Sequence, residues 1–254
     1  MIKDKLYGLI GHPLSHSFSK KYFTNKFEKE SIIDCEYQLF PIENIEQLPE
    51  LIKNNPQLKG FNVTIPYKES IIPFLDELDE TAKVVGAVNC VKVISNKDKL
   101  IGYNTDTYGF KQSIKPFLES RHERALIFGT GGASKAVAYV LKQIGIDCFF
   151  VTRNKNKSEV STSELFDYSD LNKAVFDSFK LIINTTPVGM FPDLNSSLLI
   201  PYHSITPSHL LYDIIYNPTE TEFLKQGKKQ GATTINGLSM FYQQAEESWK
   251  TWNK

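Results

Sequence analysis

The stretch Arg124-Ala125-Leu126-Ile127-Phe128-Gly129-Thr130-Gly131-Gly132-Ala133-Ser134 decides the fold. A short apolar run ends at a glycine-rich turn, and the residues from there to Ile144 have the pattern of a helix. A strand, a glycine-rich turn and a helix in this order are typical of a dinucleotide-binding fold. Gly129 would permit the tight turn, and Gly131 would let a pyrophosphate approach the backbone at the helix N-terminus. Because Ser134 stands where a third glycine is usual, a turn that merely needs glycine stays an alternative.

The residues after the next strand bear on which dinucleotide binds. The strand predicted at 146–151 is followed by Thr152-Arg153-Asn154-Lys155-Asn156-Lys157, and no acidic residue occurs before Glu159. Enzymes that select NAD usually carry Asp or Glu about 20 residues after the turn, where it binds the ribose 2′-hydroxyl. Guanidinium and ammonium groups suit a 2′-phosphate instead. The pattern favours NADP, with a solvated basic loop as the alternative.

The composition is that of a globular protein with room for one large or two small domains. Of the 254 residues, 41% are hydrophobic, and 29 Lys and Arg balance 29 Asp and Glu. This zero net charge does not support nucleic-acid or membrane-surface binding, and no apolar run approaches the ~20 residues of a membrane span. The 3 cysteines form no metal or disulfide spacing, and no signal peptide is recognisable, so we expect a cytoplasmic protein without a metal.

Strands and helices alternate along the chain, which predicts a mostly parallel sheet with helical crossovers. A polar segment at 119–123 could lead into a second domain. The expected strands are 6–11, 35–42, 59–65, 88–94, 99–102, 124–128, 146–151, 181–184 and 210–215, with 88–94 and 99–102 as a hairpin. The expected helices are 17–29, 45–53, 68–78, 81–85, 106–118, 132–144, 220–230 and 239–252.

Five polar residues are candidates for a site, although each has an ordinary explanation by itself. Lys68 directly follows a predicted strand, at the sheet edge where open α/β folds bind ligands, but a lone lysine is usually a surface charge. Asp106 begins a predicted helix, where aspartate commonly caps. Asn89 lies in an apolar strand and needs hydrogen-bond partners. Ser17 and Ser19 could bind a carboxylate at a helix start or simply cap the helix.

Taken together, these residues resemble the shikimate dehydrogenase family. The resemblance covers nearly the whole chain, and several motifs in family order are far more specific than any one of them. The motifs are His16-Ser17-Phe18-Ser19, Asn62-Val63-Thr64-Ile65-Pro66-Tyr67-Lys68, Gly86-Ala87-Val88-Asn89, Asn104-Thr105-Asp106, Gly129–Ser134, Asn184-Thr185-Thr186-Pro187-Val188-Gly189-Met190, Asp213-Ile214-Ile215-Tyr216-Asn217-Pro218 and, near the end, Asn236-Gly237-Leu238-Ser239-Met240 with Gln244.

The resemblance implies a two-domain α/β protein, in which a substrate domain with a mostly parallel sheet accompanies a Rossmann-type NADP-binding domain. Residues 1–104 with 237–254 are expected to form the substrate-binding catalytic domain, and 105–236 the NADP-binding domain. The implied reaction is the reversible reduction of 3-dehydroshikimate to shikimate by NADPH, in the biosynthesis of chorismate and the aromatic amino acids. A small-molecule substrate is expected, while the sequence leaves monomer and homodimer open.

The resemblance also implies a role for each candidate residue. Lys68 and Asp106 would be the catalytic pair and would also contact the substrate. Ser17 and Ser19 would hold the substrate carboxylate. The residues implied to bind ring hydroxyls are Thr64, Asn89, Tyr216 and Gln244. The residues implied to contact NADP are Gly129, Gly131, Gly132, Ala133, Ser134, Thr152, Arg153, Asn154, Lys157, Ile214, Gly237 and Glu80.

Some positions depart from the family pattern, and other functions stay open. Lys20 stands where the family often has proline, and Thr152-Arg153-Asn154 replaces the usual Asn-Arg-Thr while keeping the arginine. The chain ends soon after Trp252, so a terminal helix of longer relatives is expected to be absent. One alternative is a quinate/shikimate dehydrogenase with broader cofactor use. Another is a non-catalytic NADP-binding regulator, which would be expected to lack Lys68 or Asp106.

Overall fold

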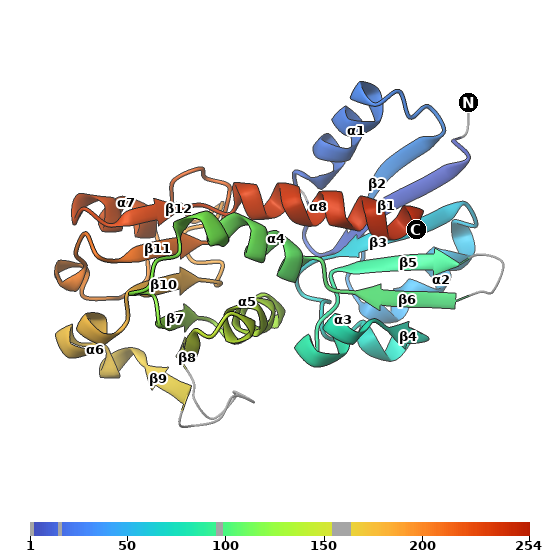
Figure 1. Cartoon of the computed structure of the whole chain (residues 1–254). Helices are drawn as coiled ribbons and strands as arrows, with labels where there is room; N and C mark the ends of the chain where they lie inside the picture. Colours follow the sequence, from blue (N-terminus) through green and yellow to red (C-terminus); the bar gives the residue numbers. More distant parts are fainter. Residues whose placement is uncertain (1–2, 15–16, 95–98, 154–163) are drawn as a thin grey trace. The chain divides into compact units, whose positions relative to one another are not determined.

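The computed structural model describes residues 3–14, 17–94, 99–153 and 164–254 (Figure 1). The chain divides into two compact units. The first unit consists of Met1–Thr105 with Ala245–Lys254, and the second of Asp106–Gln244. Each unit is built around a six-stranded sheet with helices. The α/β class predicted from the sequence is therefore confirmed.

The sheet of the first unit has the strand order β2-β1-β3-β5-β6-β4. Strand β1 pairs in parallel with β2 and β3, and β4 pairs in parallel with β6. Strand β5 runs antiparallel to β3 and β6, so the predicted hairpin interrupts a mostly parallel sheet. The strands are β1 (Lys5–Gly11), β2 (Cys35–Pro41), β3 (Leu58–Val63), β4 (Glu77–Leu78), β5 (Cys90–Ile94) and β6 (Lys99–Tyr103).

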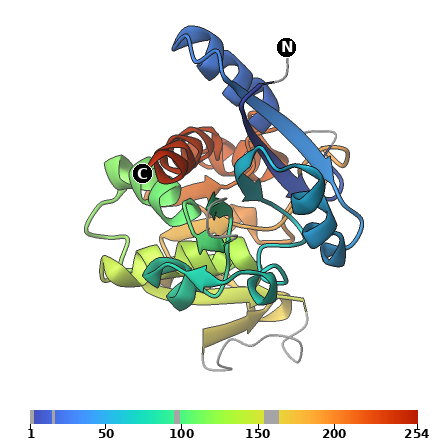
Figure 2. The same cartoon turned by 90° about the vertical axis from the view of Figure 1, so that its right-hand side faces the viewer.

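Alternating side chains of β1 enter two hydrophobic cores of the first unit. Leu6 and Ile10 belong to one core, whereas Tyr7 and Leu9 belong to the other, because successive side chains of a strand point to opposite faces. Helix α1 (Ser19–Lys29) contributes to the second core, as the Phe23 ring stacks on the Tyr37 ring with 4.4 Å between centroids. Figure 2 shows α1 with β1 and β2 as the blue segments.

The last turns of α8 (Leu238–Asn253) are fixed to the first sheet by a tryptophan. The Trp252 indole N–H donates to the Val91 carbonyl at 3.0 Å. A Cβ atom at Gly60 would overlap with the Trp252 ring, so glycine is required for this close approach. The C-terminal end of the predicted amphipathic helix therefore packs on β3 and β5.

The helix predicted at 68–78 is wrong. The structure has a turn after Lys68, the short 3₁₀ helix η2 (Ile72–Phe74) and the strand β4. Pro73 lacks the N–H that a continuous helix needs, and Asp76 pairs with β6 by accepting the Leu100 N–H at 2.7 Å. The other predicted helices of this half are found as η1 (Ile45–Gln47) with α2 (Leu48–Asn54), and as α3 (Glu80–Val85).

The sheet of the second unit is parallel throughout its six strands, in the order β12-β11-β10-β7-β8-β9. Figure 1 shows this order from β12 at the top to β9 at the bottom. It is the order of a doubly wound dinucleotide-binding sheet, in which successive strands are added first on one side of β7 and then, from β10 on, on its other side. The strands are β7 (Arg124–Phe128), β8 (Asp147–Thr152), β9 (Leu165–Asp167), β10 (Leu181–Asn184), β11 (Leu210–Asp213) and β12 (Thr233–Ile235).

Helices line both faces of the second sheet, around two cores. One core includes Phe110, Leu141 and Met240, and the other includes Phe176 and Leu224. The sequence did not predict β9, β12 or α6, whose short segments carry little periodicity. The helices are α4 (Asp106–Ile114) with η3 (Lys115–Phe117), α5 (Gly132–Gln143), η6 (Tyr168–Asp170), α6 (Lys173–Ser178), η7 (Tyr202–Ser204), α7 (Glu222–Lys229) and the start of α8.

The compact units and the predicted domains differ at their bounds. The prediction assigns Thr105 to the NADP-binding domain and all residues from Gly237 to the substrate domain. In the structure, the first unit includes Thr105, and α8 is divided between Gln244 and Ala245. The functional identity of the two domains stays a prediction.

Candidate functional site

The glycine-rich turn between β7 and α5 has the geometry of a dinucleotide-binding turn. Gly129 has a φ of +107°, which side-chain-bearing residues rarely adopt, and a Cβ atom there would lie 2.8 Å from the Thr185 Oγ1 atom. At Gly131, by contrast, a Cβ atom would meet no described heavy atom within 4 Å. The space in front of Gly131 is therefore open to a ligand, at the N-terminus of a twelve-residue helix. These residues fit a pyrophosphate.

Ser134 has a structural task that the sequence did not reveal. Its side chain is buried, and its hydroxyl donates to the Gly131 carbonyl at 2.6 Å. Gly132 and Ala133 form the first turn of α5 together with this serine. The hydroxyl thus holds the turn from inside the helix, which explains why serine can stand where a third glycine is usual.

The glycine-rich turn is hydrogen-bonded to the end of β10, at the switch point between β7 and β10 where the strand order reverses. Thr185, just after β10, donates to the Phe128 carbonyl with its backbone N–H at 3.0 Å and with its hydroxyl at 2.6 Å. Doubly wound sheets bind ligands at this point. The loops that follow β7 and β10 are therefore bonded to each other at the carboxyl ends of these strands, before any ligand binds.

The residues predicted to select NADP follow β8. Thr152 ends this strand half-buried, and Arg153 lies exposed just beyond it, while Asn154 and Lys157 are outside the described residues. The sequence missed Asp167, which lies opposite Thr152 in the β8–β9 pairing. Its carboxylate accepts the Ser169 N–H at 3.1 Å and the Ser169 hydroxyl at 3.0 Å, as the cap of η6. The Asp167 carboxylate is therefore occupied in capping η6. The sequence signal for this role is an Asp two residues before a Ser.

A fully buried carboxylate joins the ends of β10 and β11. Asp213 accepts hydrogen bonds from the Asn184 amide at 3.1 Å, the Thr221 hydroxyl at 2.6 Å and the Ile215 N–H at 3.0 Å. Burial disfavours the charged form more than these bonds favour it, and the pKa of Asp213 is raised to about 6. The network fixes the backbone that carries Ile214 and its neighbours.

The buried Asp213 carboxyl predicts a pH dependence of stability. Because its pKa is raised in the folded state, the native protein holds this proton at pH values where the unfolded chain has lost it. The contribution of Asp213 to the free energy of unfolding should therefore fall by about 3 kcal/mol between pH ~4 and ~6, and stay constant above. The difference in the free energy of urea unfolding between the wild type and Asp213→Asn should fall by this amount across the range.

The exposed Asp147, at the start of β8, provides the matched control. Asp147→Asn should keep the pH dependence of the wild type. An Asp213→Asn protein whose stability changes with pH like that of the wild type would contradict the assignment.

The predicted residues of the 213–218 motif meet the start of α8. The Gly237 N–H donates to the Ile215 carbonyl at 3.0 Å, and a Cβ atom at Gly237 would overlap with the Ile214 carbonyl. The Tyr216 ring lies 4.9 Å from the Phe241 ring, and the half-buried Gln244 donates to the Phe241 carbonyl at 3.0 Å. The fold therefore brings Ile214 together with Gly237, and connects Tyr216 and Gln244 through Phe241.

Lys68 and Thr64 are held in a compact turn after β3. The Thr64 N–H donates to the Ile10 carbonyl, and the Tyr67 N–H donates to the Thr64 carbonyl, both at 2.9 Å. The Lys68 carbonyl accepts the Val88 N–H at 2.7 Å. Lys68 and Thr64 are half-buried, so both remain accessible from a backbone that is fixed on two sides.

Asn89 is held by Thr105, sixteen residues later. Its amide donates to the Thr105 hydroxyl at 3.0 Å, and its carbonyl oxygen accepts the Thr105 N–H at 2.6 Å. Its expected need for partners is met here. Asp106 follows directly as the first residue of α4, which confirms the predicted helix start, and it is 6% exposed. Asp106 belongs to the second unit, whereas Lys68 belongs to the first.

The two serines lie at the start of α1. The buried Ser19 is the first residue of the helix, and its N–H donates to the Ser17 hydroxyl oxygen at 3.2 Å. Ser17 thus makes a local side-chain-to-backbone bond at the helix start, although the N-cap position itself is Phe18. A hydroxyl that accepts one hydrogen bond can still donate its own proton, so this bond is compatible with carboxylate binding.

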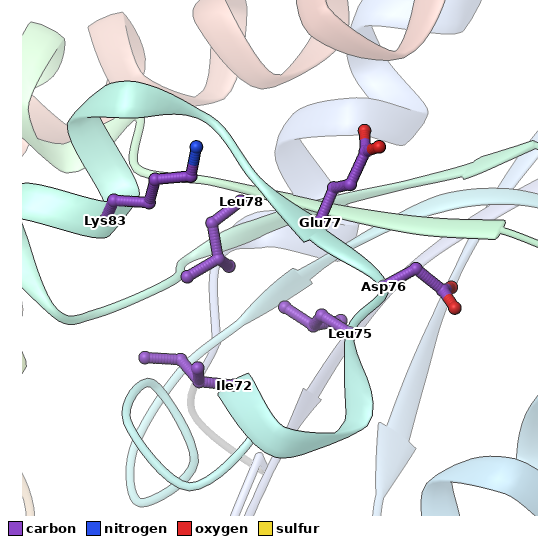
Figure 3. Close-up of a pocket in the computed structure, with 6 residues that line it drawn as sticks. All are labelled: Ile72, Leu75, Asp76, Glu77, Leu78 and Lys83. Carbon is purple, nitrogen blue, oxygen red and sulfur yellow. The ribbon is translucent and has the colours of Figure 1, made fainter.

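Glu80 lies on the surface of the first unit. Its carboxylate pairs with the Lys83 ammonium at 2.9 Å, and both side chains are exposed. A nearby pocket of about 550 Å³ includes none of the predicted site residues. Figure 3 shows its lining: Ile72, Leu75, Asp76, Glu77, Leu78 and Lys83.

The described residues offer neither a cluster of metal ligands nor a membrane span. No group of at least three His, Cys, Asp or Glu side chains there could hold a metal ion. None of the helices in the described ranges has the length and apolar character that crossing a membrane requires. Cys35, Cys90 and Cys148 are buried and form no disulfide, and burial raises the pKa of Cys35 and Cys148 to about 12.

Known proteins are similar to this chain over nearly its whole length. A family model described as the shikimate dehydrogenase substrate binding domain matches residues 9–91. A shikimate dehydrogenase (NADP(+)) of Methanococcus maripaludis (strain C6) is 41% identical over 262 residues, covering 98% of this chain and 92% of that protein. The chain belongs to the shikimate dehydrogenase family. The family resemblance noted from the motifs is thereby confirmed.

Solved structures of the shikimate dehydrogenase family have the same fold. The crystal structure from Aquifex aeolicus is 38% identical with a TM-score of 0.85, covering 98% of this chain and 92% of that one. A shikimate dehydrogenase crystallised in complex with NADP+ is 33% identical with a TM-score of 0.84, covering 99% and 91%. The predicted two-domain α/β architecture is confirmed, while the roles of individual residues stay predictions.

Proposed function

We propose that this protein catalyses the reversible NADPH-dependent reduction of 3-dehydroshikimate to shikimate, in the biosynthesis of chorismate and the aromatic amino acids. The observation that carries the proposal is the 41% identity to a shikimate dehydrogenase (NADP(+)) over 98% of the chain. The presence of both Lys68 and Asp106 supports an enzyme over a regulator that has kept only the fold. We further propose a cytoplasmic location, since Cys35, Cys90 and Cys148 form no disulfide, with monomer or homodimer as the assembly.

The proposed cofactor is NADP, which supplies the hydride when it is bound as NADPH. The open space at Gly131 and the start of α5 would receive the pyrophosphate, held by Gly129, Gly131, Gly132, Ala133 and Ser134. The 2′-phosphate would be bound at the end of β8, and the nicotinamide beside the 213–218 segment. The proposed residues are Thr152, Arg153, Asn154 and Lys157 for the phosphate, and Ile214 and Gly237 for the nicotinamide. Glu80 is proposed to approach the cofactor.

Lys68 is the proposed acid and base. During reduction its ammonium group would donate a proton to the ring carbonyl oxygen and offer positive charge as that oxygen becomes an alkoxide. During oxidation it would accept the proton of the hydroxyl group. Asp106, as the second member of the pair, would supply a carboxylate that orients the ammonium group.

Hydrogen bonds within the first unit support this pair. The Lys68 carbonyl is bonded to Val88, and the side chain of the next residue, Asn89, is bonded to Thr105. Asp106 is covalently joined to Thr105. The backbone at Lys68 is therefore held by Val88, and the backbone before Asp106 is held by the next residue, Asn89. Holding both from consecutive residues positions the reacting groups reproducibly.

The remaining polar residues are proposed to bind the substrate. Ser17 and Ser19 would donate hydrogen bonds to its carboxylate, and the half-buried Thr64 lies in the same turn as Lys68. Ring hydroxyls have both donors and acceptors, which amide and hydroxyl side chains match. The residues proposed to bind them are Thr64, Asn89, Tyr216 and Gln244.

Replacing Ser17 and Ser19 together with alanine should raise the KM for shikimate by about 10- to 100-fold, because hydrogen bonds to a charged group are lost. The affinity for NADP should stay unchanged. Steady-state kinetics with shikimate and with its uncharged carboxamide would test the role. The wild type should discriminate strongly against the amide and the double variant less. Equal discrimination by both would mean that the serines only cap α1.

A spectrophotometric assay of shikimate oxidation tests the proposed function. Purified enzyme should reduce NADP+ in the presence of shikimate, with much lower rates for NAD+ or for quinate. Comparable rates with quinate or NAD+ would support the quinate/shikimate alternative instead. No reduction of either cofactor with either substrate would support a non-catalytic role and overturn the proposal.

A further inference from the structure

A buried polar network runs through the first unit, and the proposed substrate-binding residue Asn89 is one of its members. The Asn62 amide donates to the Ser248 hydroxyl at 2.8 Å and to the Asn89 carbonyl at 3.1 Å, and its oxygen accepts the Tyr37 hydroxyl at 3.0 Å. The Ser248 hydroxyl lies 3.0 Å from the Thr105 hydroxyl. Both amide protons and the amide oxygen of Asn62 are thus engaged, which fixes its orientation.

The network lies where the chain passes between the units. The chain leaves the first unit after Thr105 and returns to it at Ala245, one turn of α8 before Ser248. Ser248 is fully buried, and Asn62 is 5% exposed on β3. The Lys26 ammonium pairs with Glu246 at 2.9 Å, and Trp252 donates to Val91, so this part of α8 is held on both sides of Ser248.

We propose that Ser248 is a positioning residue of the reaction. The Ser248 hydroxyl, which accepts a hydrogen bond from Asn62, bonds to the Thr105 hydroxyl. Thr105 in turn fixes the backbone immediately before Asp106. Removing the hydroxyl takes away the bond between the Ser248 and Thr105 side chains, while the bonds between Thr105 and Asn89 remain, and gives the Thr105–Asp106 peptide more freedom. The inference rests on the proposed function, because it assigns Ser248 a task for a catalytic Asp106.

Turnover and hydrogen exchange of a Ser248→Ala variant test the inference. Loss of one neutral hydrogen bond changes an equilibrium by about 2- to 10-fold, so kcat should fall by about that factor while the Kd for NADP stays unchanged. The Thr105 and Asp106 amides should exchange faster with solvent. Thr251→Ala is the matched control, since Thr251 is buried one turn further along α8 and makes none of the described bonds of this network. It should change neither kcat nor this exchange.

An Asp106→Asn background separates positioning from simple structural support. If Ser248 acts through Asp106, Ser248→Ala should lower kcat in the wild-type background and have little effect in Asp106→Asn. The same fold-loss in both backgrounds, or no loss in either, would overturn the inference. If Ser248→Ala does not fold, Ser248→Cys keeps a weak donor of similar size and should give an intermediate loss with the same dependence on Asp106.

The exchange measurement keeps this inference distinguishable from the proposed function. A wild-type enzyme that does not oxidise shikimate would refute the function, and with it the catalytic task of Asp106. Faster exchange at Thr105 in Ser248→Ala would still support the hold of Ser248 on Thr105, whereas unchanged exchange would refute that hold in an active or an inactive enzyme.

Discussion

Replacing Lys68 with alanine is expected to lower the kcat of shikimate oxidation by about two to four orders of magnitude, the range typical of a positioned acid or base. The KM for shikimate and the Kd for NADP should change much less. The backbone at Lys68 is fixed by its bond to Val88 and by the Thr64–Tyr67 turn, so the alanine variant should keep the fold. Steady-state kinetics and a thermal unfolding curve on the same preparation would check both.

Two further lysine variants sharpen this test. Lys68→Arg keeps a positive charge but cannot release its proton near neutral pH, so it should remain strongly impaired if proton transfer is the task. Lys92→Ala removes a half-buried lysine from β5, in the sheet of the first unit to which β3 also belongs, and should leave kcat near the wild-type value. Near-normal turnover of Lys68→Ala would refute the assignment of Lys68 as acid and base.

The sequence predicted best the elements that local pattern determines. The strands β7 and β10 have the predicted bounds, because each is a short apolar run between polar or glycine residues. The glycine-rich turn was predicted because its conformation requires glycine at Gly129. The helix predicted at 68–78 was wrong because pairing of β4 with β6 outweighed the local helix propensity. The short strands β9 and β12 were not predicted, because they form by pairing with β8 and β11.

The candidate site was predictable as a set of residues but not as a set of contacts. Local position and the combination of motifs named Asn89 and Asp106, whereas the bonds between Asn89 and Thr105 require the fold to bring residues 16 apart together. The sequence predicts no role for Asp213 beyond its place in a motif, although an acid at the end of an apolar strand indicates that it must have hydrogen-bond partners. The task of Ser134 inside its own helix had no signal in the sequence.

Replacing Arg153 with alanine is expected to weaken the binding of NADP by about 10- to 100-fold, since a charge-assisted hydrogen bond contributes about 1.5–3 kcal/mol. Binding of NAD should be nearly unchanged, because NAD lacks the 2′-phosphate. Arg153 lies exposed just after β8, at the sheet edge where doubly wound folds bind nucleotides, and Asp167 nearby is committed to capping η6. Titration of both cofactors by calorimetry would measure the two constants.

Arg124 is the matched control for Arg153, because it is an exposed arginine of the same sheet at the start of β7, where the strands begin rather than end. Arg124→Ala should therefore leave the affinity for both cofactors unchanged. Raising the salt concentration should reduce the preference for NADP over NAD in the wild type more than in Arg153→Ala, because an exposed charge pair is screened. Equal weakening of NADP and NAD by Arg153→Ala would instead assign Arg153 to the shared part of the cofactor or to folding.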